Sequence, residues 1–259
     1  MSHGKKWAIV TGASSGIGTA LAEDAAARGY SLILVARRRD RLEELAKRLG
    51  GNGIETQVVA TDLGTSDGVA VLVDATTKKG VVPDVFFNNA GYGTNGAFLD
   101  ASVERELAMI DLNCRSLVEL CHHYGYAMRK RGSGTIVNVG SVLSFMPAAY
   151  LAVYAATKAF VLSFSEALAQ ELQSSGVTVV ALCPGATATE FSDVAKFKKS
   201  DKSAPFVQSA GDVSRTAWHA IDRGRTVAVS GTANKVTAFF LRHAPRAVTA
   251  RISSSFRPA

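Results

Sequence analysis

Short apolar runs alternate with longer amphipathic segments along most of the chain. The runs are rich in Val, Ile and Leu and are bounded by glycine or polar residues, so they predict buried β-strands. The segments between them carry apolar residues at helical spacing, as at Val69, Leu72, Val73 and Ala75. Strands are expected at 6–10, 31–36, 56–60, 85–88, 135–139, 177–182 and 226–230. Helices are expected at 20–28, 38–49, 67–79, 103–131, 150–174 and 211–223.

This alternation predicts one α/β domain. Strand–helix–strand units favour parallel strands covered on both faces, and right-handed crossovers then give a Rossmann-type doubly wound order. The length of 259 residues is at the upper end for one domain, and no repeat or linker divides the chain. We expect a seven-stranded, mostly parallel sheet within residues 1–232. Residues 186–210 form a long irregular stretch expected to be a substrate lid, with lysines at Lys196, Lys198, Lys199 and Lys202.

Residues 233–259 are expected to be a basic amphipathic extension of the same domain. Seven basic residues and no acid follow Asp222, so this end of the chain carries the whole net charge of +7. Such a concentrated charge argues against a broadly basic nucleic-acid-binding domain. Pro245 divides the apolar and basic pattern into two short helices. We favour packing against the substrate mouth or a partner subunit, and the alternative is contact with an anionic membrane surface.

The composition narrows the class of protein. With 47% apolar and 20% charged residues, the chain is not disordered, collagenous or disulfide-stapled. Three cysteines and the absence of a recognisable signal peptide or an apolar stretch of about 18–20 residues predict a soluble cytoplasmic protein with free thiols. Cys114 and Cys121 share a helical face near two histidines, but their spacing is not that of a metal site, so no metal is expected.

A glycine-rich loop follows the first predicted strand. It reads Gly12-Ala13-Ser14-Ser15-Gly16-Ile17-Gly18 and opens the first helix. Glycines allow a tight turn and close approach to a phosphate, and a helix N-terminus offers unpaired N–H groups. The spacing departs from the general G-x-G-x-x-G fingerprint, and the alternative is a plain strand-to-helix turn. We favour a dinucleotide site.

The end of the second strand points to NADP(H). An NAD-binding protein places an acid there for the ribose 2′-hydroxyl, whereas this chain has Arg37 and no acid until Asp40. A guanidinium binds a 2′-phosphate through charge-assisted hydrogen bonds of about 1.5–3 kcal/mol each, which is roughly a 10- to 100-fold preference. Ser14 could add a hydroxyl to the same phosphate. Arg39 and Arg41 are interpreted as the solvated start of a helix.

A tyrosine and a lysine stand one helical turn apart after the fifth predicted strand. The four-residue spacing places Tyr154 and Lys158 on one face. A nearby ammonium stabilises a phenolate, so the pair makes a general acid usable at neutral pH. Such a pair alone is common on helices. Ser141, at the carboxyl edge of the sheet where ligands of such folds bind, makes the catalytic interpretation the stronger one.

At these positions the sequence resembles the short-chain dehydrogenase/reductase family, over about residues 5–232. The matching segments are 11–18, Asp62-Leu63, Asn88-Asn89-Ala90-Gly91, Asn113, Ser141, Tyr154 with Lys158, and Pro184-Gly185. The resemblance implies that Tyr154 donates a proton to the substrate carbonyl oxygen as hydride arrives from the nicotinamide, and that Ser141 holds that oxygen. It further implies that Lys158 binds the nicotinamide ribose and lowers the pKa of Tyr154, and that Asn113 positions a water in the proton relay.

The resemblance also implies further contacts. Asp62 would bind the adenine amino group, with the Leu63 backbone nearby. Asn89 and Ala90 would line the adenine ribose, and Gly91 would allow close approach. The segment from Pro184 and Gly185 would touch the nicotinamide amide, through Thr189 first and Thr187 second. Tyr150 is favoured as substrate wall beside Ser141 and Tyr154, and Asn88 as a brace between strands.

The leading function is NADPH-dependent reduction of a ketone or aldehyde. An NAD-dependent alcohol dehydrogenase is the alternative enzyme, and a non-catalytic dinucleotide sensor is the alternative of another class. The lysines of the lid and the apolar tail suggest a long, apolar substrate with an anionic end, such as a 3-oxoacyl thioester, or a steroid-like carbonyl. The resemblance implies a homodimer or homotetramer built through the helices that contain Asn113 and Tyr154.

Overall fold

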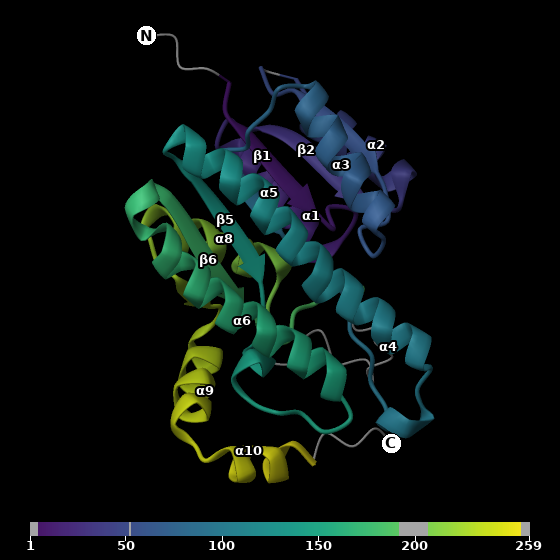
Figure 1. Cartoon of the computed structure of the whole chain (residues 1–259), viewed down its shortest axis with the longest axis vertical. Coiled ribbons are helices and arrows are strands. Elements are labelled where there is room, and N and C mark those ends of the chain that lie inside the picture. The colour runs from purple at the N-terminus through teal and green to yellow at the C-terminus, as the bar shows by residue number, and fades with distance from the viewer. Residues whose placement is uncertain (1–4, 52, 192–206, 255–259) are drawn as a thin grey trace.

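The computed structural model describes residues 5–51, 53–191 and 207–254 (Figure 1). Its centre is one seven-stranded sheet of order β3-β2-β1-β4-β5-β6-β7 in which every neighbouring pair is parallel. The direction in which the strands are added reverses between β1 and β4, so the doubly wound prediction is confirmed. The strands are β1 (Trp7–Thr11), β2 (Ser31–Ala36), β3 (Thr56–Ala60), β4 (Val85–Asn88), β5 (Gly134–Val139), β6 (Val177–Cys183) and β7 (Val227–Val229).

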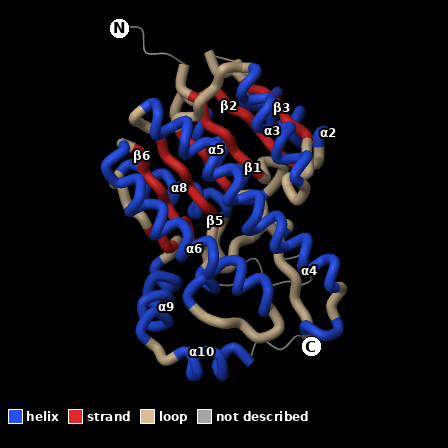
Figure 2. The backbone as a smooth tube through the Cα atoms, in the orientation of Figure 1, coloured by secondary structure: helices blue, strands red, loops and turns tan. Residues whose placement is uncertain are grey.

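Helices cover both faces of the sheet, and β1 shows why. Ala8 and Val10 point into one core, with side chains from α1 (Gly16–Ala27), α2 (Arg39–Leu49) and α8 (Ala210–Asp222). Trp7 and Ile9 point into the other, with α3 (Ser66–Lys78), α5 (Ser116–Arg131) and α6 (Ala152–Leu172). Alternate residues of a strand face opposite sides, so a strand that is apolar throughout needs a helical layer on each. Figure 2 shows α3, α5 and α6 in front of the strands.

The helix predicted at 103–131 contains an irregular turn. It consists of α4 (Val103–Ile110), a π-helical turn (Asp111–Arg115) and α5. A uniform helical pattern in the sequence gives no sign of a wider turn, so the uninterrupted helix was expected and is wrong here. π turns insert one residue and redirect side chains, and they are frequent at functional sites. This one contains Asn113.

The helix predicted from Tyr150 begins later, at Ala152. Tyr150 adopts φ +64°, which is the left-handed region, so it lies in the loop before the helix. Its carbonyl accepts a hydrogen bond from the Gly96 amide at 2.9 Å, which holds this loop against the segment after β4. Short 3₁₀ turns lie at Phe98–Asp100, Val142–Phe145 and Gln173–Ser175.

The C-terminal extension forms the two helices expected from its pattern. They are α9 (Thr232–His243) and α10 (Arg246–Ser253), separated at Pro245. Figure 1 shows them beneath the loop that leads into α6. The contact includes a hydrogen bond from the Ala149 amide to Ser253 Oγ at 3.0 Å. In the described ranges no helix is both long and apolar enough to cross a membrane.

The two ends of the expected lid pair with each other. The Ala188 amide donates to the Gln208 carbonyl at 2.8 Å, and the Gln208 amide donates to the Ala186 carbonyl at 2.9 Å. These bonds close the base of the segment next to the sheet edge. Residues 192–206 of the lid, which include all four of its lysines, lie outside the described residues.

Candidate active site

Most of the residues singled out from the sequence gather at one edge of the sheet. Because all strands are parallel, the segments that follow β1, β4, β5 and β6 leave the sheet at the same side. These segments carry, in turn, the glycine-rich loop, Asn89 to Gly91, Ser141, and Pro184 with Gly185. Ligands of open α/β sheets bind at this edge, next to the point where the strand order reverses.

The glycine-rich loop has the backbone that a phosphate site needs. Gly12 and Gly16 have φ values of +67° and +56°, and a Cβ on Gly18 would lie 2.1 Å from the Gly12 carbonyl oxygen. Ser15 begins α1 without a side-chain cap, and the first turn contains no acid. The first N–H groups of α1 therefore have no side-chain acceptor at the cap and face the loop opening, where an anion is favoured.

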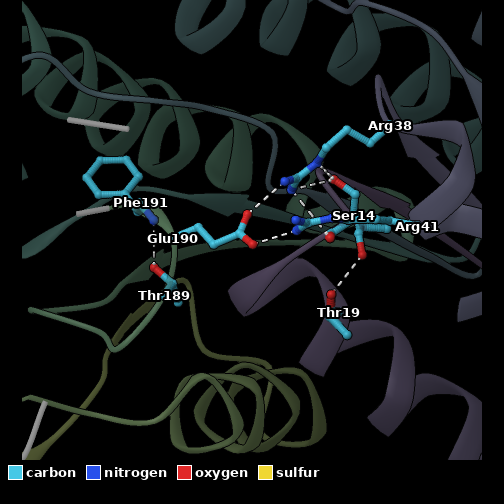
Figure 3. A network of polar contacts seen from close by, with 8 residues as sticks. Ser14, Thr19, Arg38, Arg41, Thr189, Glu190 and Phe191 are labelled. Carbon is cyan, nitrogen blue, oxygen red and sulfur yellow. Dashed lines mark hydrogen bonds and ion pairs between the residues drawn. The ribbon is translucent and has the colours of Figure 1, made fainter. Parts of the chain in front are cut away.

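Ser14 connects this loop to the basic end of β2 (Figure 3). Arg38 donates from Nη2 and Nε to Ser14 Oγ at 3.0 and 3.2 Å. Arg38 Nη1 also donates to Glu190 Oε2 at 2.8 Å, and Arg41 Nη1 donates to Glu190 Oε1 at 2.5 Å. Sequence reasoning missed Arg38 and Glu190 and interpreted Arg41 as solvated. The partner of both arginines lies about 150 positions away along the chain, where no local pattern reveals it.

Arg37, the residue expected to bind the 2′-phosphate, has its guanidinium turned toward Asp62 in this structure. Its guanidinium lies 3.8 Å from an Asp62 carboxylate oxygen, and its side chain is 76% exposed. The other oxygen of Asp62 accepts the Gly64 amide at 2.9 Å. Leu63 is buried in the core, so only its backbone could face a cofactor. Arg39 pairs with Glu43 at 3.6 Å and is solvated, as expected.

The segment after β4 is held against β1 by Thr11. Its Oγ accepts the amides of Asn89 and Ala90, each at 2.9 Å, and its carbonyl accepts Asn89 Nδ2 at 2.8 Å. Asn88 points the other way and donates to the Leu117 carbonyl at 3.2 Å, so its role is structural as expected, but it joins β4 to helix α5 and not to a neighbouring strand. Asn89 and Ala90 thus reach the sheet edge in a fixed position.

Asn113 is buried at the π turn and binds the same segment. Its Nδ2 donates to the Tyr92 carbonyl at 3.0 Å and to Thr157 Oγ1 at 3.1 Å, and its Oδ1 accepts the Tyr92 amide at 3.2 Å. Gly91 lies between Asn113 and Lys158, because a Cβ there would lie 2.8 Å from Asn113 Oδ1 and 3.5 Å from Lys158 Nζ. Only glycine fits this approach.

Ser141, Tyr154 and Lys158 are all buried beside one another. Lys158 Nζ donates to the Val139 carbonyl at 2.7 Å and lies 5.9 Å from the centre of the Tyr154 ring. Ser141 Oγ accepts the Leu143 amide at 3.1 Å, which leaves its own hydrogen for another acceptor. The structure therefore brings together the four residues proposed from the sequence as catalytic.

Burial controls the acid–base behaviour of this group. It raises the pKa of Tyr154 to about 12, and a hydrogen bond with Ser141 opposes the rise. Burial also lowers the pKa of Lys158 to about 8. The Lys158 ammonium donates to a backbone carbonyl here, and the burial of Tyr154 dominates, so the Tyr154 pKa lies above its usual value.

The segment after β6 crosses from the catalytic group to the glycine-rich loop. Thr187 Oγ1 donates to the Gly185 carbonyl at 2.9 Å, within its own segment. The Thr189 methyl packs against Gly16 of the glycine-rich loop, where a Cβ on Gly16 would lie 2.8 Å from it. Phe191 lies against Tyr154 with ring centres 5.5 Å apart. Pro184 is buried at the start of this segment. Thr189 is therefore the threonine nearer to the glycine-rich loop.

The cysteines and histidines form no second site within the described ranges. The three thiols are free, and burial raises the pKa values of Cys114 to about 11 and of Cys121 and Cys183 to about 12. No three metal-ligating side chains gather there.

Tyr150 lines a small recess with Gly96 and Val153, next to the loop that carries Ser141.

The residues present fit a nicotinamide dinucleotide. Glycines without room for a Cβ, an uncapped helix N-terminus and a serine–arginine pair provide an anion cradle at one end of the edge. A buried tyrosine and lysine lie at the other. This arrangement is typical of oxidoreductases that use a nicotinamide dinucleotide.

Comparison with known proteins identifies the family. A sequence model of the short chain dehydrogenase family matches residues 6–199. An uncharacterized oxidoreductase of Staphylococcus saprophyticus is 36% identical over 190 residues, which cover 72% of this chain and 80% of that protein. The very-long-chain 3-oxoacyl-CoA reductase of Rattus norvegicus is 31% identical over 244 residues, with 89% and 75% covered. The chain belongs to the short-chain dehydrogenase family of oxidoreductases.

Solved structures agree with this assignment. A short-chain dehydrogenase from Sphingobium yanoikuyae in complex with NADPH superimposes with a TM-score of 0.81 and 34% identity, covering 90% of this chain and 92% of that one. A 3-ketoacyl-(acyl-carrier-protein) reductase from Brucella melitensis complexed with NADH gives 0.76 and 27%, with 88% and 96% covered. Both nicotinamide coenzymes therefore occur among its structural neighbours.

Proposed function

We propose that the protein reduces a ketone or aldehyde carbonyl to an alcohol with NADPH, reversibly. The observation that carries this proposal is the meeting of Ser141, Tyr154, Lys158 and Asn113 at the sheet edge, beside the glycine-rich loop. A relative named as a 3-oxoacyl-CoA reductase supports the same chemistry. A dinucleotide sensor would have no need to keep all four residues.

The side chains divide the work by position. The bound coenzyme supplies the hydride for the carbonyl carbon. Tyr154, whose pKa is raised to about 12, is protonated at neutral pH, and it donates that proton to the carbonyl oxygen as charge develops there. With substrate bound, Ser141 donates its hydroxyl hydrogen to the same oxygen. Lys158 retains two ammonium hydrogens beyond its bond to Val139, and these suit the ribose hydroxyls.

Recognition of the 2′-phosphate is assigned to the arginines after β2. Arg37 is exposed at the strand end, and Arg38 lies on Ser14 of the glycine-rich loop. We expect Arg37→Ala to weaken NADPH binding while NADH binding hardly changes, and Arg38→Gln to do so more strongly. Equal weakening of both coenzymes would refute this role. Preference for NADPH would also exclude the NAD-dependent alcohol dehydrogenase.

Aromatic side chains lie on the substrate side of the site. Tyr150, Phe191 and the base of the lid surround the position of Ser141 and Tyr154, with α9 and α10 behind the loop. This setting suits a long apolar carbonyl compound, such as a 3-oxoacyl thioester. We further propose that two chains associate through α4, the π turn that carries Asn113, and α6, which border an apolar groove of about 600 Å³.

A turnover assay tests the proposal. NADPH oxidation is followed against 3-oxoacyl thioesters, steroid ketones, diketones and aromatic aldehydes, with NADH alongside. We expect turnover with one class and a loss of roughly 10²–10⁴-fold in Tyr154→Phe, which retains the ring but has no proton to donate. NADPH binding should persist in this variant. Turnover that survives in Tyr154→Phe would contradict the proposed mechanism.

A further inference from the structure

A carboxylate lies on the basic groups beside the glycine-rich loop. Glu190 extends from the segment after β6 and places one oxygen 2.8 Å from Arg38 and the other 2.5 Å from Arg41 (Figure 3). Arg38 is at the same time bound to Ser14. β2 is not followed by an acidic residue at its end. Glu190, which is distant in sequence, supplies a carboxylate at this place instead.

The partners of Glu190 are those that a phosphate would use. Two guanidinium groups and a serine hydroxyl form a set of donors typical of phosphate binding. A carboxylate can satisfy two of these donors but carries only one negative charge, whereas a phosphate monoester carries up to two. The two guanidinium groups hold the pKa of Glu190 near 2, so the carboxylate stays ionised at any working pH.

The carboxylate is exposed enough to leave. The Glu190 side chain is 44% exposed, and those of Arg38 and Arg41 are 40% and 42% exposed. Thr189 is packed on Gly16 and Phe191 on Tyr154, so the tether on each side of Glu190 is short. A displaced carboxylate thus remains close to the arginines, at high effective concentration.

We propose that Glu190 is an internal competitor for the 2′-phosphate of the coenzyme, occupying the Arg38–Arg41 anion site until the phosphate displaces it. This inference rests on the proposed use of NADP(H). A ligand without a 2′-phosphate leaves the ion pairs intact, and its affinity does not depend on Glu190. The residue therefore sets how strongly the protein discriminates between the two coenzymes.

Calorimetric titration of the whole chain with two fragments tests this. The probes are adenosine 2′,5′-bisphosphate and adenosine 5′-monophosphate. Glu190→Gln removes the charge but keeps the shape, and two half-exposed ion pairs correspond to roughly a twofold to thirtyfold gain in affinity for the bisphosphate. Affinity for the monophosphate should be unchanged. Glu43→Gln is the matched control, since Glu43 pairs with Arg39 on the same helix and gives the same change in net charge.

The outcomes separate this inference from the proposed coenzyme preference. If Glu190→Gln tightens the bisphosphate no more than Glu43→Gln, weakens it, or tightens both probes equally, then Glu190 is not a competitor. Arg38→Gln decides the rest. If it weakens the bisphosphate while Glu190→Gln has no effect, only the competition fails. If the unsubstituted chain binds both probes equally and Arg38→Gln changes neither, the NADP(H) preference fails with it.

Discussion

Tyr154 and Lys158 lie one turn apart on α6, yet burial moves their pKa values in opposite directions. The pKa of the Tyr154 phenol rises to about 12, so it is harder to ionise. The pKa of the Lys158 ammonium falls to about 8, so it is easier to deprotonate. Both shifts favour the neutral side chain, because charge is costly away from water. The sequence could predict the pairing but not these shifts, since spacing says nothing about where Lys158 Nζ finds its acceptor.

We predict that kcat/KM for NADPH falls as the pH rises through about 8. Lys158 loses its proton there, and with it the charge that holds the coenzyme ribose, while Tyr154 keeps its proton to well above pH 10. The pH dependence of kcat/KM reports on the free enzyme, so it is the measurement to make. In Lys158→Arg the guanidinium stays charged, and the decrease near pH 8 should disappear even if the maximum rate is lower. A decrease at the same pH in both proteins would assign it to another group.

The basic end of β2 shows what local sequence can and cannot reveal. The absence of an acid and the presence of arginines can be read from the sequence, and they predict an anion-binding site at the end of β2. Which arginine meets the glycine-rich loop depends on how the chain leaves the strand. Arg37 turns to Asp62 and Arg38 to Ser14. Glu190 was invisible because its partners come from another part of the sheet.

Among the elements, the π turn determines where Asn113 points. α4 and α5 follow one helical path, and the inserted residue turns Asn113 onto the Tyr92 backbone and Thr157. Thr157 in turn donates to the Tyr154 carbonyl at 2.8 Å. The spacing of apolar residues predicts the helices on either side, but it is not sensitive to a single wide turn. The π turn at Asn113 could therefore not be predicted from the sequence. The family resemblance alone brought Asn113 into the candidate site.

We predict that Thr157→Val slows turnover through position rather than contact. Valine preserves the shape but removes the hydroxyl that joins Asn113 to the first turn of α6, at a cost of about 1–2 kcal/mol in unfolding free energy. The value of kcat should fall severalfold while KM for the coenzyme stays the same. Steady-state kinetics and chemical denaturation measure the two effects.

Thr76→Val provides the comparison for Thr157→Val. Thr76 is buried, donates to the Val73 carbonyl at 2.9 Å and meets the Tyr124 hydroxyl at 3.3 Å, far from the catalytic group. It should lose similar stability with kcat unchanged. If both variants lower kcat alike, the effect is one of general stability and Thr157 has no positioning role.

In the molecule as a whole, apolar side chains face outward on α4, on α6 and on the 3₁₀ turn at Phe98–Asp100. Phe98, Leu107, Ile110 and Phe160 are each 41–55% exposed, and three of them line the groove of about 600 Å³. Contiguous exposed apolar surface of this kind is typical of an interaction site. Its position on the helices that carry Asn113 and Tyr154 agrees with the association expected from the family resemblance.

We predict that the protein forms an oligomer through this groove and that Phe160→Glu converts it to monomers. A carboxylate on this surface would have to be buried unpaired in an interface, which is costly, but stays hydrated in a monomer. Light scattering after size exclusion gives the mass. Val71→Glu is the control, because Val71 is 49% exposed on α3, outside the groove. An unchanged mass in Phe160→Glu would place the interface elsewhere.

The strands and the parallel order were predictable because burial on both faces leaves a strong sequence signal. Observed strand ends differ from the expected ones by at most one residue, as at β1 and β7. The loop before α6 was less predictable. The left-handed backbone at Tyr150 is unusual for a large side chain and is held by the bond from Gly96, a contact between distant segments. Long-range contacts of this kind shape the substrate side of the site.

The C-terminal helices combine exposed aromatic residues with a firm contact to the substrate side. Phe239 and Phe240 are more than 60% exposed, whereas Arg242 lies 4.7 Å over the Phe145 ring and 3.8 Å from Glu166. Because Arg242 makes these contacts within the protein, it is not available to bind a lipid headgroup. The packing interpretation, favoured from the sequence, therefore explains more of the contacts than the membrane one.

We predict that Arg242→Gln raises KM for the carbonyl substrate severalfold with little change in coenzyme affinity. The substitution removes the cation–π contact to Phe145 and the ion pair to Glu166, so α9 holds the 3₁₀ turn after Ser141 less firmly. Lys235→Gln makes the same charge change on α9 and should leave KM unaltered. Cosedimentation with anionic vesicles supplies the opposing test, because packing predicts that the unsubstituted chain stays in the supernatant. If the chain pellets with vesicles, and Phe239→Ser with Phe240→Ser abolishes this, the aromatic face of α9 binds membranes instead.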